Sequence, residues 1–135
     1  MINGVSCVVL AGGESRRMGT DKAHVKLAGS SLLERVLKVV TPLFDDVMVS
    51  RHDHDGDCVG DGEGVRVIED QLDGRGPVVG LCSALQQARH DYVFVTACDM
   101  PFIAPGLISY LTSLRSGFDI VVPVRDGRPE PLCAV

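Results

Sequence analysis

Short apolar runs of strand-forming residues alternate along this chain with segments that carry helix signals. The runs are rich in valine, and several are apolar from end to end, which is typical of strands buried on both faces of a sheet. The expected strands are residues 5–10, 46–50, 65–69, 92–97 and 120–124. The expected helices are residues 32–42, 79–88 and 105–114, the first with a capping box at Ser31 and Glu34. Strands that alternate with helices predict an α/β fold, Rossmann-like and doubly wound, with a mostly parallel sheet and helices on both faces.

The length and composition limit the class of protein. With 135 residues, 45% of them hydrophobic, residues 1–135 are expected to form a single packed domain. A net charge of −5 and an aromatic content of 4% argue against a surface for nucleic acid or for an anionic membrane. No apolar run approaches the roughly 20 residues that span a bilayer, and the start of the chain lacks the cationic region of a signal peptide. Five cysteines without a CxxC pair fit a reducing compartment, so we expect a cytoplasmic protein.

A glycine-rich, cationic segment follows the first expected strand. Residues 10–22 read LAGGESRRMGTDK, and Gly12 and Gly13 allow the backbone to approach a ligand closely. Four cations against two acids between residues 14 and 26 make this stretch positive within a negatively charged chain. A polyphosphate is the ligand that such a loop suits best, while an ordinary solvated turn is the alternative. The segment matches neither the GxxxxGK[ST] pattern nor GxGxxG, which weakens a P-loop or dinucleotide-binding interpretation.

Two aspartates stand at the ends of later strands. Asp99 follows the most apolar run, where a carboxylate can bind a hard cation such as Mg²⁺ or can cap the turn before Pro101. Asp70 follows the strand at 65–69, where it can accept hydrogen bonds from a sugar or base or can simply form a turn. In a parallel sheet the carboxyl ends of the strands share one edge, so we expect both acids and the glycine loop to converge there.

The segment 51–64 is rich in histidine and aspartate but does not have the spacing of a metal site. Counted from Asp53, an EF-hand would need glycine and glutamate where Cys58 and Gly64 stand, and the placement of His52 and His54 fits no structural zinc pattern. We therefore expect a solvated surface loop without bound metal.

Several motifs of this chain resemble those of the molybdenum cofactor guanylyltransferases, a branch of the nucleotidyltransferase superfamily. The family pattern LAGGxSxRMGxDK is met in full by residues 10–22, and CDMPF by residues 98–102. Asp70 followed by GPVVG at residues 76–80, and GRPEPLCAV at residues 127–135, also look like family sequence. Related cytidylyltransferases usually carry LAAG, so Gly12 favours guanine.

The resemblance implies a site and a reaction. Arg17, Lys22 and Asp99 would be catalytic, with Arg17 and Lys22 on phosphates and Asp99 on Mg²⁺. The backbone around Leu10, Ala11 and Gly12 would contact the guanine base. The full set of residues implied to bind the nucleotide is Leu10, Ala11, Gly12, Gly13, Lys22, Asp70 and Asp99.

The implied reaction is attack by the terminal phosphate of molybdenum-molybdopterin on the α-phosphate of GTP. Pyrophosphate then leaves and molybdopterin guanine dinucleotide remains. Transient contact with molybdenum cofactor enzymes or insertion factors is a further implied property of the family.

Two departures from the family pattern leave alternatives open. Ser50 stands where the family often has Asn, and the family usually continues well past Val135, so the chain is expected to lack a C-terminal part and with it much of the molybdopterin side. A cytidylyl- or sugar-nucleotidyltransferase of the same fold is the nearest alternative enzyme. A non-catalytic GTP-binding module is the alternative from another class.

The phosphate role of the cationic loop leads to a prediction for Lys22→Ala. Because a hydrogen bond to a charged group is worth roughly 1.5–3 kcal/mol, affinity for GTP with Mg²⁺ should fall about tenfold or more. Calorimetric titration of the folded variant measures this change. An affinity equal to that of the unaltered chain would remove Lys22 from the phosphate site.

Overall fold

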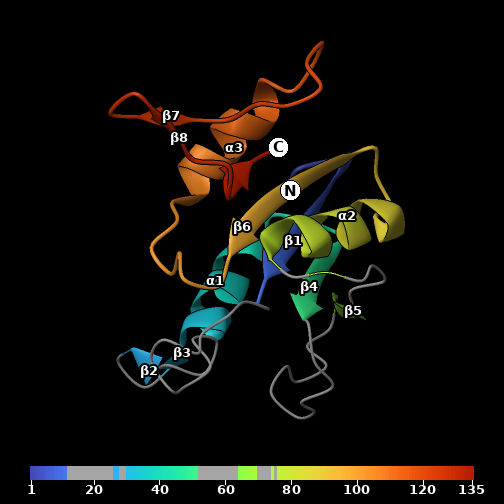
Figure 1. Ribbon diagram of the computed structural model, residues 1–135, viewed down its shortest axis with the longest axis vertical. Coiled ribbons are helices and arrows are strands. Elements are labelled where there is room, and N and C mark those ends of the chain that lie inside the picture. Colours follow the sequence, from blue (N-terminus) through green and yellow to red (C-terminus); the bar gives the residue numbers. More distant parts are fainter. Residues whose placement is uncertain (12–25, 28–29, 52–63, 70–73, 75) are drawn as a thin grey trace.

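The computed structural model describes residues 1–11, 26–27, 30–51, 64–69, 74 and 76–135 (Figure 1). Its centre is a five-stranded sheet in the order β5-β4-β1-β6-β9. The strands of this sheet are β1 (Val5–Leu10), β4 (Val47–Arg51), β5 (Val65–Glu69), β6 (Tyr92–Ala97) and β9 (Cys133–Ala134). The first four match strands expected from the sequence to within a residue at each end.

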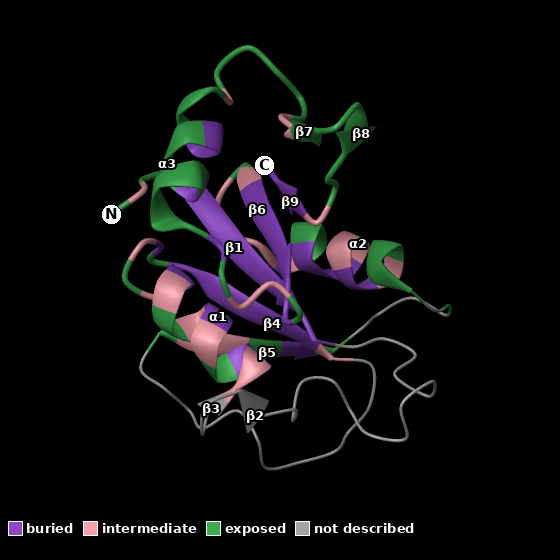
Figure 2. Cartoon of the chain, turned by 90° about the vertical axis from the view of Figure 1, so that its left-hand side faces the viewer, coloured by how far each residue is buried: buried purple, intermediate pink, exposed green. Residues whose placement is uncertain are grey.

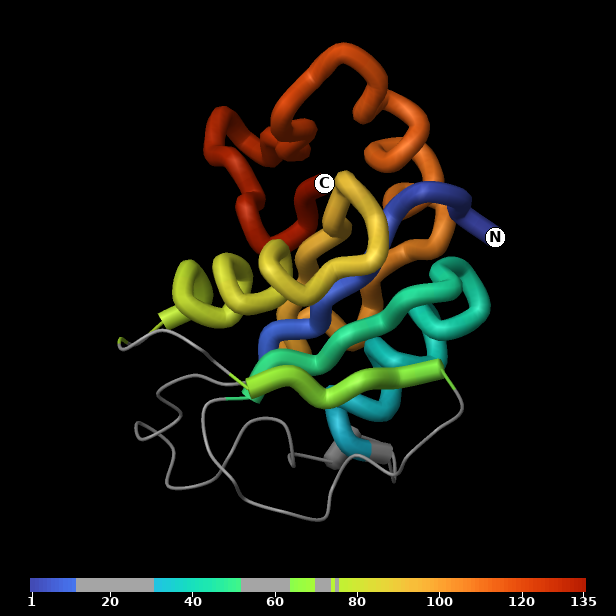
Figure 3. Tube along the Cα trace, turned by 90° about the vertical axis from the view of Figure 1, so that its right-hand side faces the viewer, coloured from blue at the N-terminus to red at the C-terminus, as the bar shows by residue number. Residues whose placement is uncertain are grey.

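The central strand β1 is paired in parallel on both sides. Its residues lie in register with β4 from Cys7 opposite Val47, and with β6 from Val5 opposite Tyr92. All six residues of β1 are buried, as the apolar run predicts for a strand covered on both faces. Only β9 runs antiparallel, where the end of the chain returns to lie beside β6 (Figure 3).

Helices cover both faces of the sheet, which confirms the doubly wound arrangement (Figure 2). Along β1 the odd-numbered residues pack with α1 (Leu32–Val40) and α3 (Pro105–Ser113), and the even-numbered Val8 and Leu10 pack with α2 (Pro77–Gln87). This separation follows from the period of two along a strand, since successive side chains point to opposite faces.

The helix boundaries follow the capping signals in the sequence. The Ser31 hydroxyl accepts from the Glu34 N–H at 3.1 Å, and the Glu34 carboxylate accepts from the Ser31 N–H at 3.0 Å, so the expected capping box is present. Proline occupies the first turn of both α2 and α3, where its missing N–H costs no helical hydrogen bond. No helix in the described part of the chain is long and apolar enough to cross a membrane.

The prediction of a strand at residues 120–124 is wrong. Val121 exchanges backbone hydrogen bonds with Val135 at 2.7 and 3.1 Å, but the pairing does not continue as a strand of the sheet. Pro123 has no N–H to donate, and its carbonyl instead accepts from the Glu130 N–H at 2.9 Å. The chain then forms an antiparallel hairpin of β7 (Val124–Arg125) and β8 (Arg128–Pro129).

The structure contains two pairs of short antiparallel strands that the sequence analysis did not anticipate. Asp126 and Gly127 have φ angles of 50° and 75° between β7 and β8, the left-handed backbone that an Asp-Gly pair allows in a tight hairpin. A second short pair, β2 (Lys26–Leu27) and β3 (Ser30–Ser31), precedes α1.

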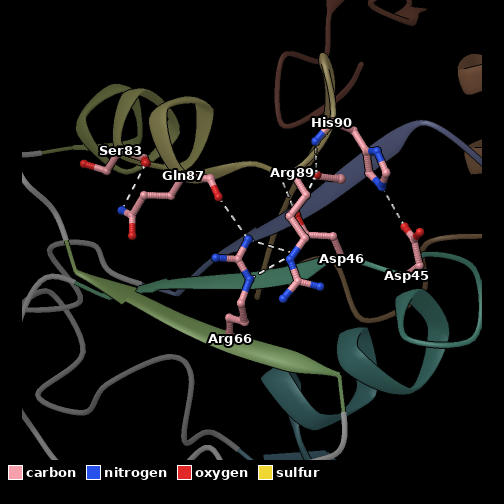
Figure 4. A network of polar contacts seen from close by, with 8 residues as sticks. Asp45, Asp46, Arg66, Ser83, Gln87, Arg89 and His90 are labelled. Atoms are coloured by element: carbon pink, nitrogen blue, oxygen red, sulfur yellow. Dashed lines mark hydrogen bonds and ion pairs between the residues drawn. The ribbon is translucent and has the colours of Figure 1, made fainter.

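A buried carboxylate joins four segments of the chain at the amino ends of the strands, the end opposite to Leu10 and Asp99 (Figure 4). The Asp46 side chain is 1% exposed and forms an ion pair with Arg66 at 2.7 Å. It also accepts a hydrogen bond from the Ser6 hydroxyl at 2.7 Å and from the Arg89 backbone N–H at 3.1 Å. Arg66 in turn donates to the carbonyl of Gln87, at the last turn of α2, at 3.0 Å. The network thus ties β1, β4, β5 and the end of α2 together.

These contacts determine the charge state of Asp46. Burial by itself raises the pKa of its carboxyl group, but the hydrogen bonds from Ser6, Arg66 and Arg89 and the positive charge of Arg66 outweigh that effect. The net result is a pKa below the ordinary value of 3.8. The carboxylate is therefore ionised and fully engaged in the folded protein.

Asp46→Asn is expected to lower the free energy of unfolding by at least about 2 kcal/mol, because Arg66 loses its buried counter-charge. Since the folded pKa lies below the ordinary one, the stabilisation by Asp46 is complete above the ordinary pKa and is lost as the pH falls through the folded value. The free energy of unfolding measured with urea should therefore fall below about pH 4 for the unaltered chain. The Asp46→Asn variant should lack this part of the pH dependence.

Asp45→Asn is the matched control, because this neighbouring carboxylate is half-exposed and pairs only with His90, at 2.9 Å, among the described residues. Its cost should stay below about 1 kcal/mol at neutral pH. Equal costs for the two substitutions would contradict the role assigned to Asp46.

Candidate active site

The ends of three neighbouring strands are joined by backbone hydrogen bonds at the point where the glycine loop begins. The Cys98 N–H donates to the Leu10 carbonyl at 3.1 Å, and the Ala11 N–H donates to the Ser50 carbonyl at 3.0 Å. The chain therefore leaves β1 between the ends of β4 and β6 and directly beside the CDMPF segment. This is the convergence expected from the parallel order of the strands.

Asp99 lies in the turn after β6 with its side chain exposed to solvent. The turn is closed by the backbone, because the Met100 N–H donates to the Ala97 carbonyl and the Ile103 N–H to the Met100 carbonyl, each at 3.2 Å. The Asp99 carboxylate has no hydrogen bond or ion pair with any residue in the described ranges. These contacts give no support to a capping role, and they leave the carboxylate oxygens available to a ligand.

The amino end of α2 packs closely on the same edge of the sheet. A Cβ added at Gly80 would lie 2.6 Å from the Ser50 Oγ and 3.1 Å from Leu10 Cδ2, so only glycine permits this approach. Before the helix, Gly76 has a φ of 102°, a backbone conformation that side chains disfavour. Ser50 itself is 3% exposed, so its side chain lies beneath α2 instead of facing a ligand.

Three of the predicted site residues lie among the described residues. Leu10, Ala11 and Asp99 lie at one edge of the sheet. The Leu10 carbonyl and the Ala11 N–H already form hydrogen bonds within the sheet, to Cys98 and Ser50. The other predicted site residues lie outside the described residues: Gly12, Gly13, Arg17, Lys22 and Asp70. Residues 52–63 of the segment expected to bind no metal also lie outside them, whereas its first residue, Arg51, ends β4. Sequence reasoning missed the contact of Gly80 with Ser50, for which a glycine inside a helix just after Pro77 was the available signal.

Two of the cysteines, Cys7 and Cys133, are buried and are not suited to nucleophilic chemistry. Burial, with a contribution from the charge of Asp46, raises the pKa of the Cys7 thiol far above its ordinary value. Burial and the neighbouring Glu130 likewise raise the pKa of Cys133. Since the thiolate is the reactive form, both groups are inert near neutral pH.

The described ranges contain no group of three or more histidine, cysteine, aspartate or glutamate side chains that could together hold a metal ion. Within these ranges no second acidic side chain joins Asp99 in such a group. Mg²⁺ often binds proteins through only one or two carboxylates and takes its other ligands from phosphates and water.

The solved structures that resemble this chain include the following two. The molybdopterin-guanine dinucleotide biosynthesis protein A of Archaeoglobus fulgidus has a TM-score of 0.73 and 29% identity, over 96% of this chain and 65% of that one. The 2-C-methyl-D-erythritol 4-phosphate cytidylyltransferase of Thermus thermophilus has a TM-score of 0.69 over 97% of this chain and 66% of that one; at 24% identity this likeness shows the fold alone. The fold is that of the nucleotidyltransferases.

Sequence similarity assigns the chain to one family within this fold. The MobA-like NTP transferase domain family matches residues 7–135, and this chain belongs to it. A curated relative from Natranaerobius thermophilus, named probable molybdenum cofactor guanylyltransferase, is 39% identical over all of this chain and 67% of its own length. The family expected from the sequence motifs is therefore confirmed. The chain spans 67%, 64% and 61% of the length of three such relatives, or about two thirds.

Because Asp99 is exposed and has no partner in the part of the chain that the structure describes, Asp99→Ala is expected to leave the fold unaffected. Surface substitutions without lost contacts usually change the free energy of unfolding by about 0.5 kcal/mol or less. Urea unfolding monitored by circular dichroism measures the change. A loss of 1 kcal/mol or more, roughly the value of a lost cap, would show that Asp99 holds the turn before Pro101.

Proposed function

We propose that this chain carries the nucleotide-binding part of a molybdenum cofactor guanylyltransferase. In the proposed reaction a terminal phosphate oxygen of molybdenum-molybdopterin attacks the α-phosphorus of GTP. The bond from that phosphorus to the bridging oxygen of pyrophosphate breaks, and pyrophosphate leaves. The names of the relatives and the LAGGxSxRMGxDK motif support guanine as the base and molybdopterin as the acceptor.

One observation carries the proposal. The hydrogen bond of 3.1 Å between the Cys98 N–H and the Leu10 carbonyl places the start of the glycine loop next to Asp99. A loop suited to phosphate and a carboxylate suited to a cation thus emerge from adjacent strands. A nucleoside triphosphate needs both partners at once, because its charge must be neutralised while its phosphates are held in line for transfer.

The chemistry of the donor set fits a magnesium ion. Asp99 has an exposed carboxylate without a competing partner in the described ranges, and it is the residue that would hold the ion together with phosphate oxygens of GTP. When bound, the ion supplies positive charge to the pyrophosphate leaving group. The fixed backbone of the turn from Ala97 to Met100 positions the carboxylate, so little reorganisation is required on binding.

The remaining groups follow from the sequence. Arg17 and Lys22 supply cations to the phosphates, and Asp70 accepts hydrogen bonds from the nucleoside. The Leu10 carbonyl and the Ala11 N–H already have partners in the sheet, so contacts to guanine are expected mainly from backbone groups that follow them, including those of Gly12 and Gly13. No protein nucleophile is required, because the acceptor phosphate is itself anionic.

Residues 1–135 act in this proposal as a single nucleotidyltransferase domain. Because the relatives are about half as long again, residues for molybdopterin, and any contacts with molybdenum cofactor enzymes or insertion factors, are proposed to belong to sequence beyond the matched part. The 135-residue chain is then expected to bind GTP with magnesium more readily than it turns it over.

Asp99→Asn tests the metal role, because it keeps the shape of the side chain and removes the charge that holds the ion. In calorimetric titrations with and without Mg²⁺, the variant should lose the magnesium-dependent part of GTP affinity, a loss of about tenfold or more. Its unfolding curve should match that of the unaltered chain.

CTP serves as the control nucleotide, since a cytidylyltransferase of the same fold would prefer it. Tighter binding of CTP than of GTP by the unaltered chain would refute the guanine assignment. Full magnesium-dependent GTP binding by Asp99→Asn would remove Asp99 from the mechanism. Guanine dinucleotide formed from GTP and molybdenum-molybdopterin would separate an enzyme from a binding module.

A further inference from the structure

Helix α2 contacts the sheet most closely where the candidate site begins. The atoms that a side chain at Gly80 would meet belong to Ser50 and Leu10, with the nearest, the Ser50 Oγ, at 2.6 Å from the added Cβ. These two residues are also the ones that hold the start of the glycine loop: the Ser50 carbonyl accepts from the Ala11 N–H, and Leu10 precedes it. Ser50 and Leu10 thus contact the amino end of α2 and also hold the residue at which the glycine loop begins.

The other end of α2 is fixed by the Asp46 network (Figure 4). Arg66 donates to the Gln87 carbonyl at 3.0 Å, and the backbone N–H of Arg89 donates to Asp46 at 3.1 Å. The helix therefore cannot slide along the sheet to make room for a larger residue at position 80. An added methyl group must therefore lift the amino end of α2, push the ends of β1 and β4, or displace the buried Ser50 hydroxyl from its position.

We propose that Gly80 and Ser50 form a positioning contact for the nucleotide site. Gly80 lets the amino end of α2 rest on the Ser50 side chain, and this contact keeps Ala11 and the end of β1 in the place from which the glycine loop meets its ligand. Neither residue contacts the nucleotide in this proposal. The inference rests on the proposed function, because it assumes that GTP binds at this edge of the sheet.

The steric origin of the effect makes it reversible by a second substitution. Gly80→Ala creates the clash with the Ser50 Oγ, and Ser50→Ala removes that oxygen. The new methyl group would then meet the Ser50 Cβ at 3.4 Å, an ordinary contact, and the Leu10 Cδ2 at 3.1 Å. The second contact is tight, but it involves the end of a leucine side chain, which needs to shift by only a few tenths of an ångström. A ligand-contact role for Gly80 does not predict this rescue, because removing the Ser50 hydroxyl would restore nothing to the ligand.

The experiment measures GTP affinity in the presence of Mg²⁺, together with urea unfolding, for the unaltered chain and four variants. Displacement of binding groups by a fraction of an ångström to an ångström lowers function strongly, so Gly80→Ala should bind GTP roughly tenfold more weakly or worse. The double variant with Ser50→Ala should recover to within about threefold of Ser50→Ala alone, the signature of two coupled residues. Gly106→Ala in α3 is the control, because a Cβ at Gly106 meets nothing within 4 Å.

The outcomes separate the two proposals. Absence of GTP binding by the unaltered chain would overturn the proposed function and this inference with it. Binding by the unaltered chain together with unchanged affinity in Gly80→Ala, or with a double variant no better than Gly80→Ala, would overturn the inference alone. Should Gly80→Ala fail to fold, the double variant decides: folding with GTP affinity near that of Ser50→Ala supports the contact, and failure to fold or to bind overturns it.

Discussion

The parallel pairing of β1 on both of its sides is the constraint on which the rest of this structure depends. It places β4 and β6 next to the same strand in register, and it buries all six residues of β1. Because all three strands run in one direction, their carboxyl ends lie at one edge of the sheet. Leu10 and Ala11 at the end of β1, the Asp99 turn and the buried Ser50 are neighbours for this reason, although they are far apart in the sequence.

The two ends of the sheet have different physical characters. At the amino ends of the strands, Asp46 is buried and its carboxylate oxygens bind Ser6, Arg66 and the Arg89 backbone, so its charge stabilises the fold. At the carboxyl ends, Asp99 is exposed and has no partner among the described residues. An engaged carboxylate suits a structural role, whereas one without partners suits a ligand, and this contrast guides the assignment of function to the second end.

Helix α2 connects these two ends. Its last turn is tied to Asp46 through Arg66, and its first turns rest on Ser50 and Leu10 at the candidate site. A rigid element anchored in this way can hold a binding site at a fixed distance from the core. The Asp46 network and the candidate site are thus linked through packing, without a shared side chain.

The sequence by itself determined the alternation of strands and helices, the capping box of α1 and the family. These signals are local: the period of the apolar residues, the Ser31–Glu34 pair, and motifs that are continuous in the chain. Local signals also placed Asp99 directly after a buried strand, and the structure confirms that position. Two of the family motifs, LAGGxSxRMGxDK and CDMPF, begin where β1 and β6 end, so these motifs also mark the carboxyl ends of the two strands.

Only the tertiary structure decided which neighbouring residues share contacts. The run at residues 120–124 has strand propensity, yet Pro123 and the Asp126–Gly127 turn direct it into a hairpin, since a strand requires partners for its N–H groups. Nothing in the sequence marks Asp46, among eighteen acidic residues, as the buried one, because its burial depends on Arg66 and Arg89 arriving from other segments. The contact of Gly80 with Ser50 likewise exists only after β4 and α2 pack together, since close approach is a property of pairs of elements that no single segment encodes.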